Sequence, residues 1–341
     1  GTTTSCVSCP MRILDEILSP SPDVMCSFLD NEVGKLHLWE RTSEDEDFLD
    51  VRMGVGDRSF DAMVLKVPRK GFQLHDDELR ELPYALEEKY SILKDVPLTL
   101  DLANNHTIGI IGSRSRMWEA VDEIILNIIS LHSCEEVKLV LVVSPRQKAR
   151  IEKYKNVPHI WSDDRKIRYF ATDPDEVHYI FNVIDETLKV RENTETRNLL
   201  PIPHYCMIVA DPALVEKESL TRYMENADNT VGLTTIFAYG DVTDLPKSCR
   251  TIMQCDEERT GFYTKNRNAN RFISFQQDPL DEEKIAGFAD ALSNLPVRRN
   301  RRSMGIADKI SFLQMYQAGN VEELEIEKHW DSNNSAKSLA A

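Results

Sequence analysis

The chain has 341 residues, of which 41% are hydrophobic and 29% are charged, and its formal net charge at pH 7 is −16. This length and apolar fraction suffice for two compact domains, or for one large domain with appendages. The negative charge argues against nucleic acid as the main ligand, because a phosphate backbone would be repelled over most of the surface. The sequence contains no apolar run of the length, roughly 18 residues or more, that a membrane-spanning helix needs.

Residues 1–36 contain a short helical pattern from Met11 to Leu18, followed by the breaker Ser19-Pro20-Ser21-Pro22. This pattern predicts a linker or the remnant of a stalk. The chain begins with Gly1 rather than Met, and both of its ends look cut, so we expect a piece of a longer protein.

Residues 37–102 predict a small extension of strands and one helix. The predicted strands are Phe48–Val55, Phe60–Val67 and Pro97–Leu102, and a charged helix is expected around Asp76–Tyr90. A ribbon and one helix bury too little apolar area to be stable alone. We therefore expect this extension to pack on the following domain.

From residue 103 to residue 297 apolar strands alternate with helices, which predicts a doubly wound, mainly parallel α/β sheet. The predicted strands are Ile108–Gly112, Val137–Val143, Arg168–Ala171, Tyr205–Ala210, Leu233–Tyr239 and Thr251–Gln254. The predicted helices run from the end of the first strand to about Leu131, from Pro174 to about Arg191, and from Asp281 to Leu295. Residues 298–341 are expected to be a tail leading to another module, and their basic cluster Arg298–Arg302 is most simply a solvated linker.

The first of these strands leads into a degenerate phosphate-binding motif. A Walker A loop has the pattern Gly-x-x-x-x-Gly-Lys-Ser/Thr, and this pattern begins at Gly109 and runs through Gly112 and Ser113. Arg114 then replaces the second glycine, Ser115 replaces the lysine, and Arg116 replaces the hydroxyl residue. In an intact motif the glycine shapes the loop, the lysine neutralises the phosphate oxygens and the hydroxyl binds the metal. Tight binding of Mg-ATP is therefore not expected.

The strand around Tyr205–Ala210 ends in Asp211, as a Walker B segment does, and Asp211 would then lie beside a metal ion. A glutamate that activates water is expected next in a hydrolysing enzyme, but the next residue is Pro212. Apolar strands that end in Asp are common in parallel sheets, so Asp211 is weak evidence for a metal. The two defects together favour a nucleotide pocket that has lost its chemistry.

No metal site or catalytic residue is predicted elsewhere. Cys6-x-x-Cys9 has the spacing of half a zinc site, but no second Cys or His pair follows nearby. Four other cysteines lie in or beside apolar segments and are expected to be buried free thiols: Cys134, Cys206, Cys249 and Cys255. The odd total of seven cysteines fits a reducing compartment.

Several segments resemble the membrane-proximal cytosolic domain of the EssC/EccC proteins, the FtsK/SpoIIIE-type motor ATPases of type VII secretion systems. The resemblance covers about residues 20–341 and is carried by Leu38–Arg41, Asp45–Gly56, Val96–Leu102, the loop at Gly109, Leu131–Ser133, Val137–Leu139, Ile310–Tyr316, Val321–Leu324 and Trp330. It implies a P-loop NTPase type of sheet with no established catalysis in this domain. It also implies membrane-spanning helices upstream, forkhead-associated domains ahead of them in the EssC branch, and three motor modules downstream that use ATP and Mg.

Three hypotheses for function follow. The first is a non-catalytic pseudo-ATPase domain without a cofactor, which couples the membrane anchor to the downstream ATPase modules at the cytoplasmic face of the membrane. Its partners would be those modules, other membrane components of the secretion system and further copies of itself. The second is a weak regulatory nucleotide site, with Arg114 and Arg116 holding a phosphate at a helix start. The third is an active ATPase or DNA translocase module, which the lost lysine, Pro212 and the acidic charge disfavour. We favour the first.

Overall fold

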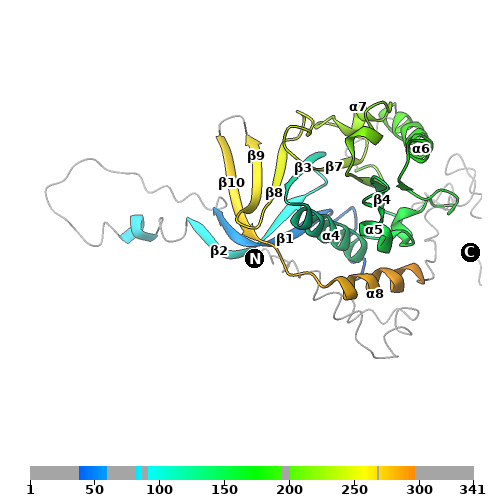
Figure 1. The fold of residues 1–341 in the computed structure, drawn as a ribbon. Helices are drawn as coiled ribbons and strands as arrows, with labels where there is room; N and C mark the ends of the chain where they lie inside the picture. Colours follow the sequence, from blue (N-terminus) through cyan, green and yellow to red (C-terminus); the bar gives the residue numbers. More distant parts are fainter. Residues whose placement is uncertain (1–37, 60–81, 87–90, 194–199, 267–268, 296–341) are drawn as a thin grey trace, which may run out of the picture. The chain divides into compact units, whose positions relative to one another are not determined.

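The computed structural model of the protein describes residues 38–59, 82–86, 91–193, 200–266 and 269–295 (Figure 1). The chain divides into two compact units after Leu295, and only the first contains described residues. The predicted helix of residues 11–18, the predicted strand Phe60–Val67, the Cys6–Cys9 pair and the tail from residue 298 lie outside the described residues. Of the helix predicted at Asp76–Tyr90, only residues 82–86 are described, and they are helical.

The described strands form one ten-stranded sheet in the order β2-β1-β10-β9-β8-β3-β7-β6-β4-β5. Six of them, from β8 to β5 in that order, pair in parallel. They are β3 (Thr107–Gly112), β4 (Val137–Val142), β5 (Phe170–Ala171), β6 (His204–Val209), β7 (Leu233–Gly240) and β8 (Thr251–Cys255). The predicted α/β architecture is confirmed, and each predicted parallel strand appears within two residues of its expected ends.

The helices cover both faces of the parallel strands. Right-handed crossovers place α4 on one face and α6 with α7 on the other, and Figure 1 shows this separation. The helices are α4 (Arg114–Leu131), α5 (Lys148–Ile151), α6 (Pro174–Glu192), α7 (Thr221–Met224) and α8 (Glu282–Ser293), with short 3₁₀ turns η1 (Glu152–Tyr154), η2 (Pro158–Ile160) and η3 (Pro212–Leu214). Asp173 caps α6 and Asp281 caps α8, each accepting two backbone N–H bonds, as residues before a helix commonly do.

Four antiparallel strands extend the sheet beyond β8. They are β9 (Thr260–Asn266), β10 (Ala269–Gln276), β1 (Asp50–Ser59) and β2 (Ile92–Asp101), which pair in that order. The pair β9 and β10 was not predicted from the sequence. Residues 50–59 and 92–101, which belong to the predicted N-terminal extension, thus continue the same sheet as the α/β core.

Burial in the hydrophobic core explains the apolar sequences of the central strands and of α4. Every residue of β4 and of β6 is buried, as expected for parallel strands covered on both faces. Helix α4 is buried on nearly all sides, because it packs against β3, β7 and β8 of the parallel strands and also against β1. The same hydrophobic core includes Val51 and Met53 of β1 and Leu98 and Leu100 of β2. The four predicted thiols are free and buried.

Candidate functional site

The carboxyl ends of the parallel strands meet at one edge of the sheet, where ligands of open α/β folds bind. This edge contains the end of β3 at Gly112, the end of β8 followed by Asp256, the end of β7 at Gly240, and the end of β6 followed by Asp211. It therefore brings together the two degenerate motifs found in the sequence.

Gly109 does not lie in the turn. It is a buried residue inside β3, where it pairs with Phe237 of β7 and Ile252 of β8. A Cβ atom at this position would lie 2.4 Å from Cδ1 of Leu245, so packing accounts for the glycine. The structure thus agrees with the predicted strand Ile108–Gly112, and the Walker A pattern that begins at Gly109 lies within β3 as far as Gly112.

Gly112 is the last residue of β3, and Ser113 alone connects this strand to α4. Gly112 has a φ of +127°, and a Cβ atom there would lie 2.2 Å from the carbonyl oxygen of Cys255. Ser113 is the N-cap residue, and the helix begins at Arg114. A phosphate-cradling loop needs several amides that curl around the anion. A single residue between strand and helix leaves no such loop.

A carboxylate of the chain itself lies at the N-terminus of α4. The backbone N–H of Ser113 donates to Oδ1 of Asp256 at 3.1 Å and to the carbonyl of Cys255 at 3.0 Å. The other oxygen of Asp256 accepts from the Gln254 side-chain amide at 2.6 Å. A helix N-terminus favours a negative group, and Asp256 supplies one where a bound phosphate would otherwise lie.

The three residues that replace the conserved part of the loop occupy the first turn of α4. Arg114 and Ser115 are exposed. The Arg116 guanidinium pairs with Glu119 at 2.8 Å, and this hydrogen bond and charge raise the pKa of Arg116. Arg116 is therefore engaged with a neighbouring acid on its own helix.

Asp211 acts as a local cap. Its Oδ1 accepts the backbone N–H of Ala213 at 3.0 Å, and Pro212 follows as the first residue of η3. Strand β7 lies between β6 and β3. At the usual strand spacing this puts Asp211 about 10 Å from the β3–α4 junction. Among the described residues no group of three or more His, Cys, Asp or Glu side chains is arranged to hold a metal ion.

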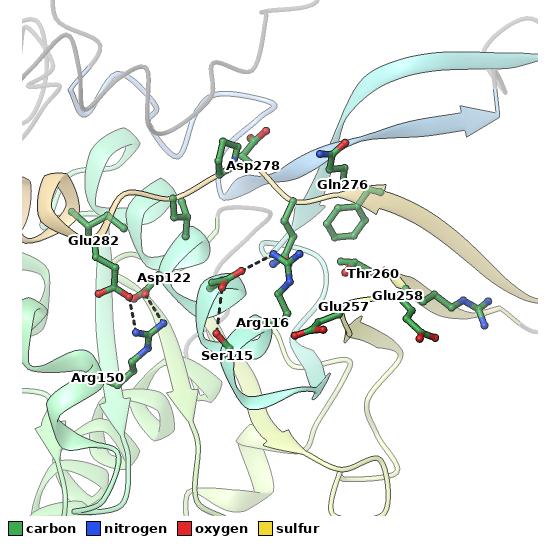
Figure 2. Close-up of a pocket in the computed structure, with 17 residues that line it drawn as sticks. Ser115, Arg116, Asp122, Arg150, Glu257, Glu258, Thr260, Gln276, Asp278 and Glu282 are labelled. Atoms are coloured by element: carbon green, nitrogen blue, oxygen red, sulfur yellow. Dashed lines mark hydrogen bonds and ion pairs between the residues drawn. The ribbon is translucent and has the colours of Figure 1, made fainter.

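A groove of about 660 Å³ lies beside the first turns of α4 (Figure 2). Its walls are the start of α4, the turn between β8 and β9, and the segment that links β10 to α8. It is lined by Ser115, Arg116, Glu119, Asp122, Arg150, Glu257, Glu258, Arg259, Thr260, Phe275, Gln276, Gln277, Asp278, Pro279, Leu280, Glu282 and Ile285. Six of these side chains are acids and three are arginines, so the lining does not favour a polyphosphate.

An ionic network around the buried Asp122 lines one part of the groove and joins residues of α4, α5, η1 and α8. Asp122 of α4 accepts from the Tyr154 hydroxyl at 2.9 Å and from Nζ of Lys153 at 3.0 Å. Burial raises the pKa of Asp122 although Lys153 opposes the change. Figure 2 shows Arg150 between Asp122 and Glu282, and its bond to Glu282 is 2.6 Å long. Burial of Glu282 acts in the opposite direction, but Lys153 and Arg150 hold its pKa below the usual value. The network thus links α4, α5, η1 and α8 through ion pairs and a hydrogen bond.

Sequence reasoning missed Asp256, Arg150, Asp278 and the network around Asp122. Asp256 had a detectable signal, since it directly follows the apolar strand β8, much as Asp211 comes soon after β6. The others had none, because their partners are distant in sequence: Arg150 and Glu282 are separated by 132 residues, and Arg52 and Asp278 by 226.

Comparison with known proteins gives relatives along most of the chain. It is 28% identical over 324 residues to the ESX secretion system protein EccC of Geobacillus thermodenitrificans, which covers 94% of this chain and 22% of that protein. It is 24% identical over 312 residues to the type VII secretion system protein EssC of Staphylococcus aureus, which covers 89% of this chain and 21% of that protein. This chain is a homologue of EccC and EssC. It spans about a fifth of their length, and no family model matches it.

Solved structures of EccC and EssC proteins also resemble the fold. ATPases 2 and 3 of EssC from Geobacillus thermodenitrificans align over 75% of this chain and 50% of that one, with a TM-score of 0.43 and 10% identity. The cytoplasmic domain of the Thermomonospora curvata type VII secretion ATPase EccC aligns over 72% of this chain and 28% of that one, with a TM-score of 0.41 and 10% identity. In the described part of the chain no helix is long and apolar enough to cross a membrane.

Proposed function

We propose that this chain is a non-catalytic coupling domain of a type VII secretion motor ATPase, a pseudo-ATPase that links a membrane anchor to downstream ATPase modules. The homology to EccC and EssC supports a role in the secretion motor. The observation that carries the non-catalytic assignment is the β3–α4 junction. One residue, Ser113, spans it, and its amide is bonded to Asp256 at 3.1 Å.

The remaining chemistry supports the same proposal. A nucleotide site requires amides around the phosphates, a lysine on the phosphate oxygens and a metal near a strand-end acid. In this chain Asp256 takes the place of the anion, Arg116 is paired with Glu119, and Asp211 caps η3. The domain would act at the cytoplasmic face of the membrane, without a cofactor of its own. Its partners would be the ATPase modules of the parent protein, other membrane components of the secretion system and further copies of the same chain.

Calorimetric titration of the chain with Mg-ATP, together with a phosphate-release assay, tests this function. We expect no saturable heat and no phosphate release above background. Asp211→Ala should leave both readings unchanged, because this side chain caps a turn. Saturable binding without turnover would instead support a regulatory nucleotide site. Turnover that Asp211→Ala abolishes would show that the domain is an active ATPase.

A further inference from the structure

The last four backbone carbonyls of α4 all accept hydrogen bonds, and three of the four donors come from a segment far away in sequence. The last four carbonyls of a helix have no partner within it. In α4 these belong to Ile128, Ile129, Ser130 and Leu131. The backbone N–H of His132 bonds the first of them at 3.1 Å, and the stretch before β1 bonds the other three.

Trp39 and Arg41 supply those three donors. The indole Nε1 of Trp39 donates to the carbonyl of Ile129 at 2.9 Å, and its backbone N–H donates to Ser130 at 2.8 Å. The backbone N–H of Arg41 donates to Leu131 at 3.0 Å. We call residues Leu38–Leu49, which include these donors, the clasp.

The side chain of Arg41 connects the first part of the clasp to its last part and to the start of β1. It is 9% exposed, and its guanidinium donates to the carbonyls of Asp50 at 2.7 Å and Asp47 at 3.2 Å while pairing with the Asp47 carboxylate at 3.1 Å. A charged fork with several acceptors makes strong and directional bonds. These bonds fix the conformation of the clasp without using any group of α4.

The C-terminal end of the clasp also contacts the residue that follows α4, His132. The backbone N–H of Leu49 donates to Nε2 of His132 at 2.9 Å, and the Phe48 ring lies edge-on to the same imidazole at 5.2 Å. Trp39 and Leu49 both have positive φ, at 57° and 58°. Such a backbone is strained for residues with a side chain, and it persists only where the surrounding contacts hold it. Both strained residues bond the C-terminal end of α4 or His132, so we infer that these contacts hold the clasp in its conformation.

Helix α4 connects the clasp to the degenerate nucleotide edge. With 18 residues it is about 27 Å long, and its other end is the Ser113–Asp256 junction. Along its length Asn127 exchanges two hydrogen bonds with the backbone of Arg52 in β1, at 3.1 and 3.3 Å. A displacement of the clasp would thus move α4 and the sheet edge together.

We propose that the clasp is a mechanical joint. A force that pulls on the chain before Leu38 would be transmitted through the clasp to α4, and would not detach the clasp from the helix first. This proposal rests on the coupling function above and assigns the transmission to Trp39 and Arg41. Both act as positioning residues, since they hold the helix end and contact no ligand.

Force spectroscopy on the full 341-residue chain, with a handle at each end, tests the joint. Peeling the clasp alone would release twelve residues, or about 40 Å of extension. We expect the wild-type protein to show no separate step of this size before the main rupture. Arg41→Ala should show it at low force. Trp39→Phe, which removes only the indole donor and keeps a ring, should show it too, and it covers the case in which Arg41→Ala fails to fold.

Matched controls make the same chemical changes away from the clasp. Trp161→Phe and Arg146→Ala should leave the force trace unchanged. Hydrogen exchange gives a second reading, because the amides of Trp39 and Arg41 should be as protected as those of α4 and lose about fivefold to tenfold protection in Trp39→Phe.

A peeling step in the wild-type protein, or clasp variants that behave like the controls, would overturn the joint but leave the non-catalytic assignment standing. Binding of Mg-ATP in the calorimetric test would refute that assignment and leave the joint intact.

Discussion

Replacing Glu123 by glutamine should stabilise the protein at neutral pH. Glu123 of α4 is 0% exposed, and neither of its carboxyl oxygens has a hydrogen-bond partner among the described residues. The nearest cation, Arg52, is bound to Asp278 at 2.7 Å. Burial, together with the negative charge of Asp278, raises the pKa of Glu123 well above its usual value, and Arg52 offsets this only in part. Glutamine has nearly the same shape and cannot ionise.

The sign of the effect follows from proton linkage. In the unfolded chain a glutamate titrates near pH 4.3, whereas the folded carboxyl keeps its proton to higher pH. Below the unfolded pKa both states are neutral and Glu123 carries no ionisation cost. As the pH rises above it, the unfolded state ionises while the folded state resists, so the wild-type protein loses stability until the pH passes the folded pKa. The variant escapes this loss.

The gain at pH 7 is set by the pKa difference, because the glutamine amide lacks a partner as much as the neutral carboxyl that it replaces. We therefore expect Glu123→Gln to raise the unfolding free energy at pH 7 by about 1.4 kcal/mol for each unit by which the folded pKa exceeds the unfolded one, and by only a few tenths near pH 4. Urea denaturation followed by circular dichroism at both pH values measures it. The matched control is Glu119→Gln, one turn earlier on α4, where the lost ion pair with Arg116 is partly exposed and should cost up to about 1 kcal/mol.

Two results would refute this reasoning. A Glu123→Gln variant that is less stable than wild type at pH 7 would mean that the folded carboxylate is ionised and bound. An equal gain at pH 4 and pH 7 would assign the effect to packing and exclude ionisation.

Further predictions concern the β3–α4 junction and the clasp. Gly112→Ala should destabilise the protein by about 2–4 kcal/mol in urea denaturation, since its φ is +127° and its Cβ would lie 2.2 Å from a carbonyl oxygen. Gly287→Ala, where a Cβ meets nothing within 4 Å, should be neutral or stabilising, and equal costs at the two sites would contradict the packing argument. The loop triple variant Arg114→Gly, Ser115→Lys, Arg116→Ser should gain no Mg-ATP affinity in calorimetry, because these residues form the first helical turn; measurable binding would mean that a loop forms there. Burial and the nearby Arg41 lower the pKa of His132 to about 3, so the wild-type urea midpoint should fall as the pH drops below about 6.5, where the unfolded chain gains the proton first. His132→Asn should show a shallower fall, and parallel pH profiles would exclude His132 as the cause.

Much of the α/β core was predictable because its strands are continuous apolar runs. Strands β4 and β6 are buried along their whole length, and burial on both faces of a sheet selects hydrophobic residues without alternation. Helix α6 was predictable from its cap and first residue, Asp173 and Pro174. The mismatch with the Walker A pattern at residues 114–116 can also be read from the sequence, since each expected residue type has a distinct chemical task.

The antiparallel strands were harder to predict. The strands of the β9–β10 hairpin are not continuous apolar runs, and Thr260–Asn266 carries glycine, lysine and asparagine beside its aromatic residues. Its strand character comes from pairing with β8 and β1. Likewise β1 continues four residues beyond the predicted end at Val55 because β2 pairs with it out to Ser59.

The sequence by itself determined the fold class, the departure from the Walker A pattern at residues 114–116, and the buried thiols, because each of these depends on residue type and local spacing. Only the tertiary structure decided that Asp256 occupies the α4 N-terminus, and that Trp39 and Arg41 cap the other end of the same helix. The contacts at the two ends of α4 join residues 90 to 143 positions apart. Their geometry depends on how the chain packs in three dimensions, which no local pattern encodes.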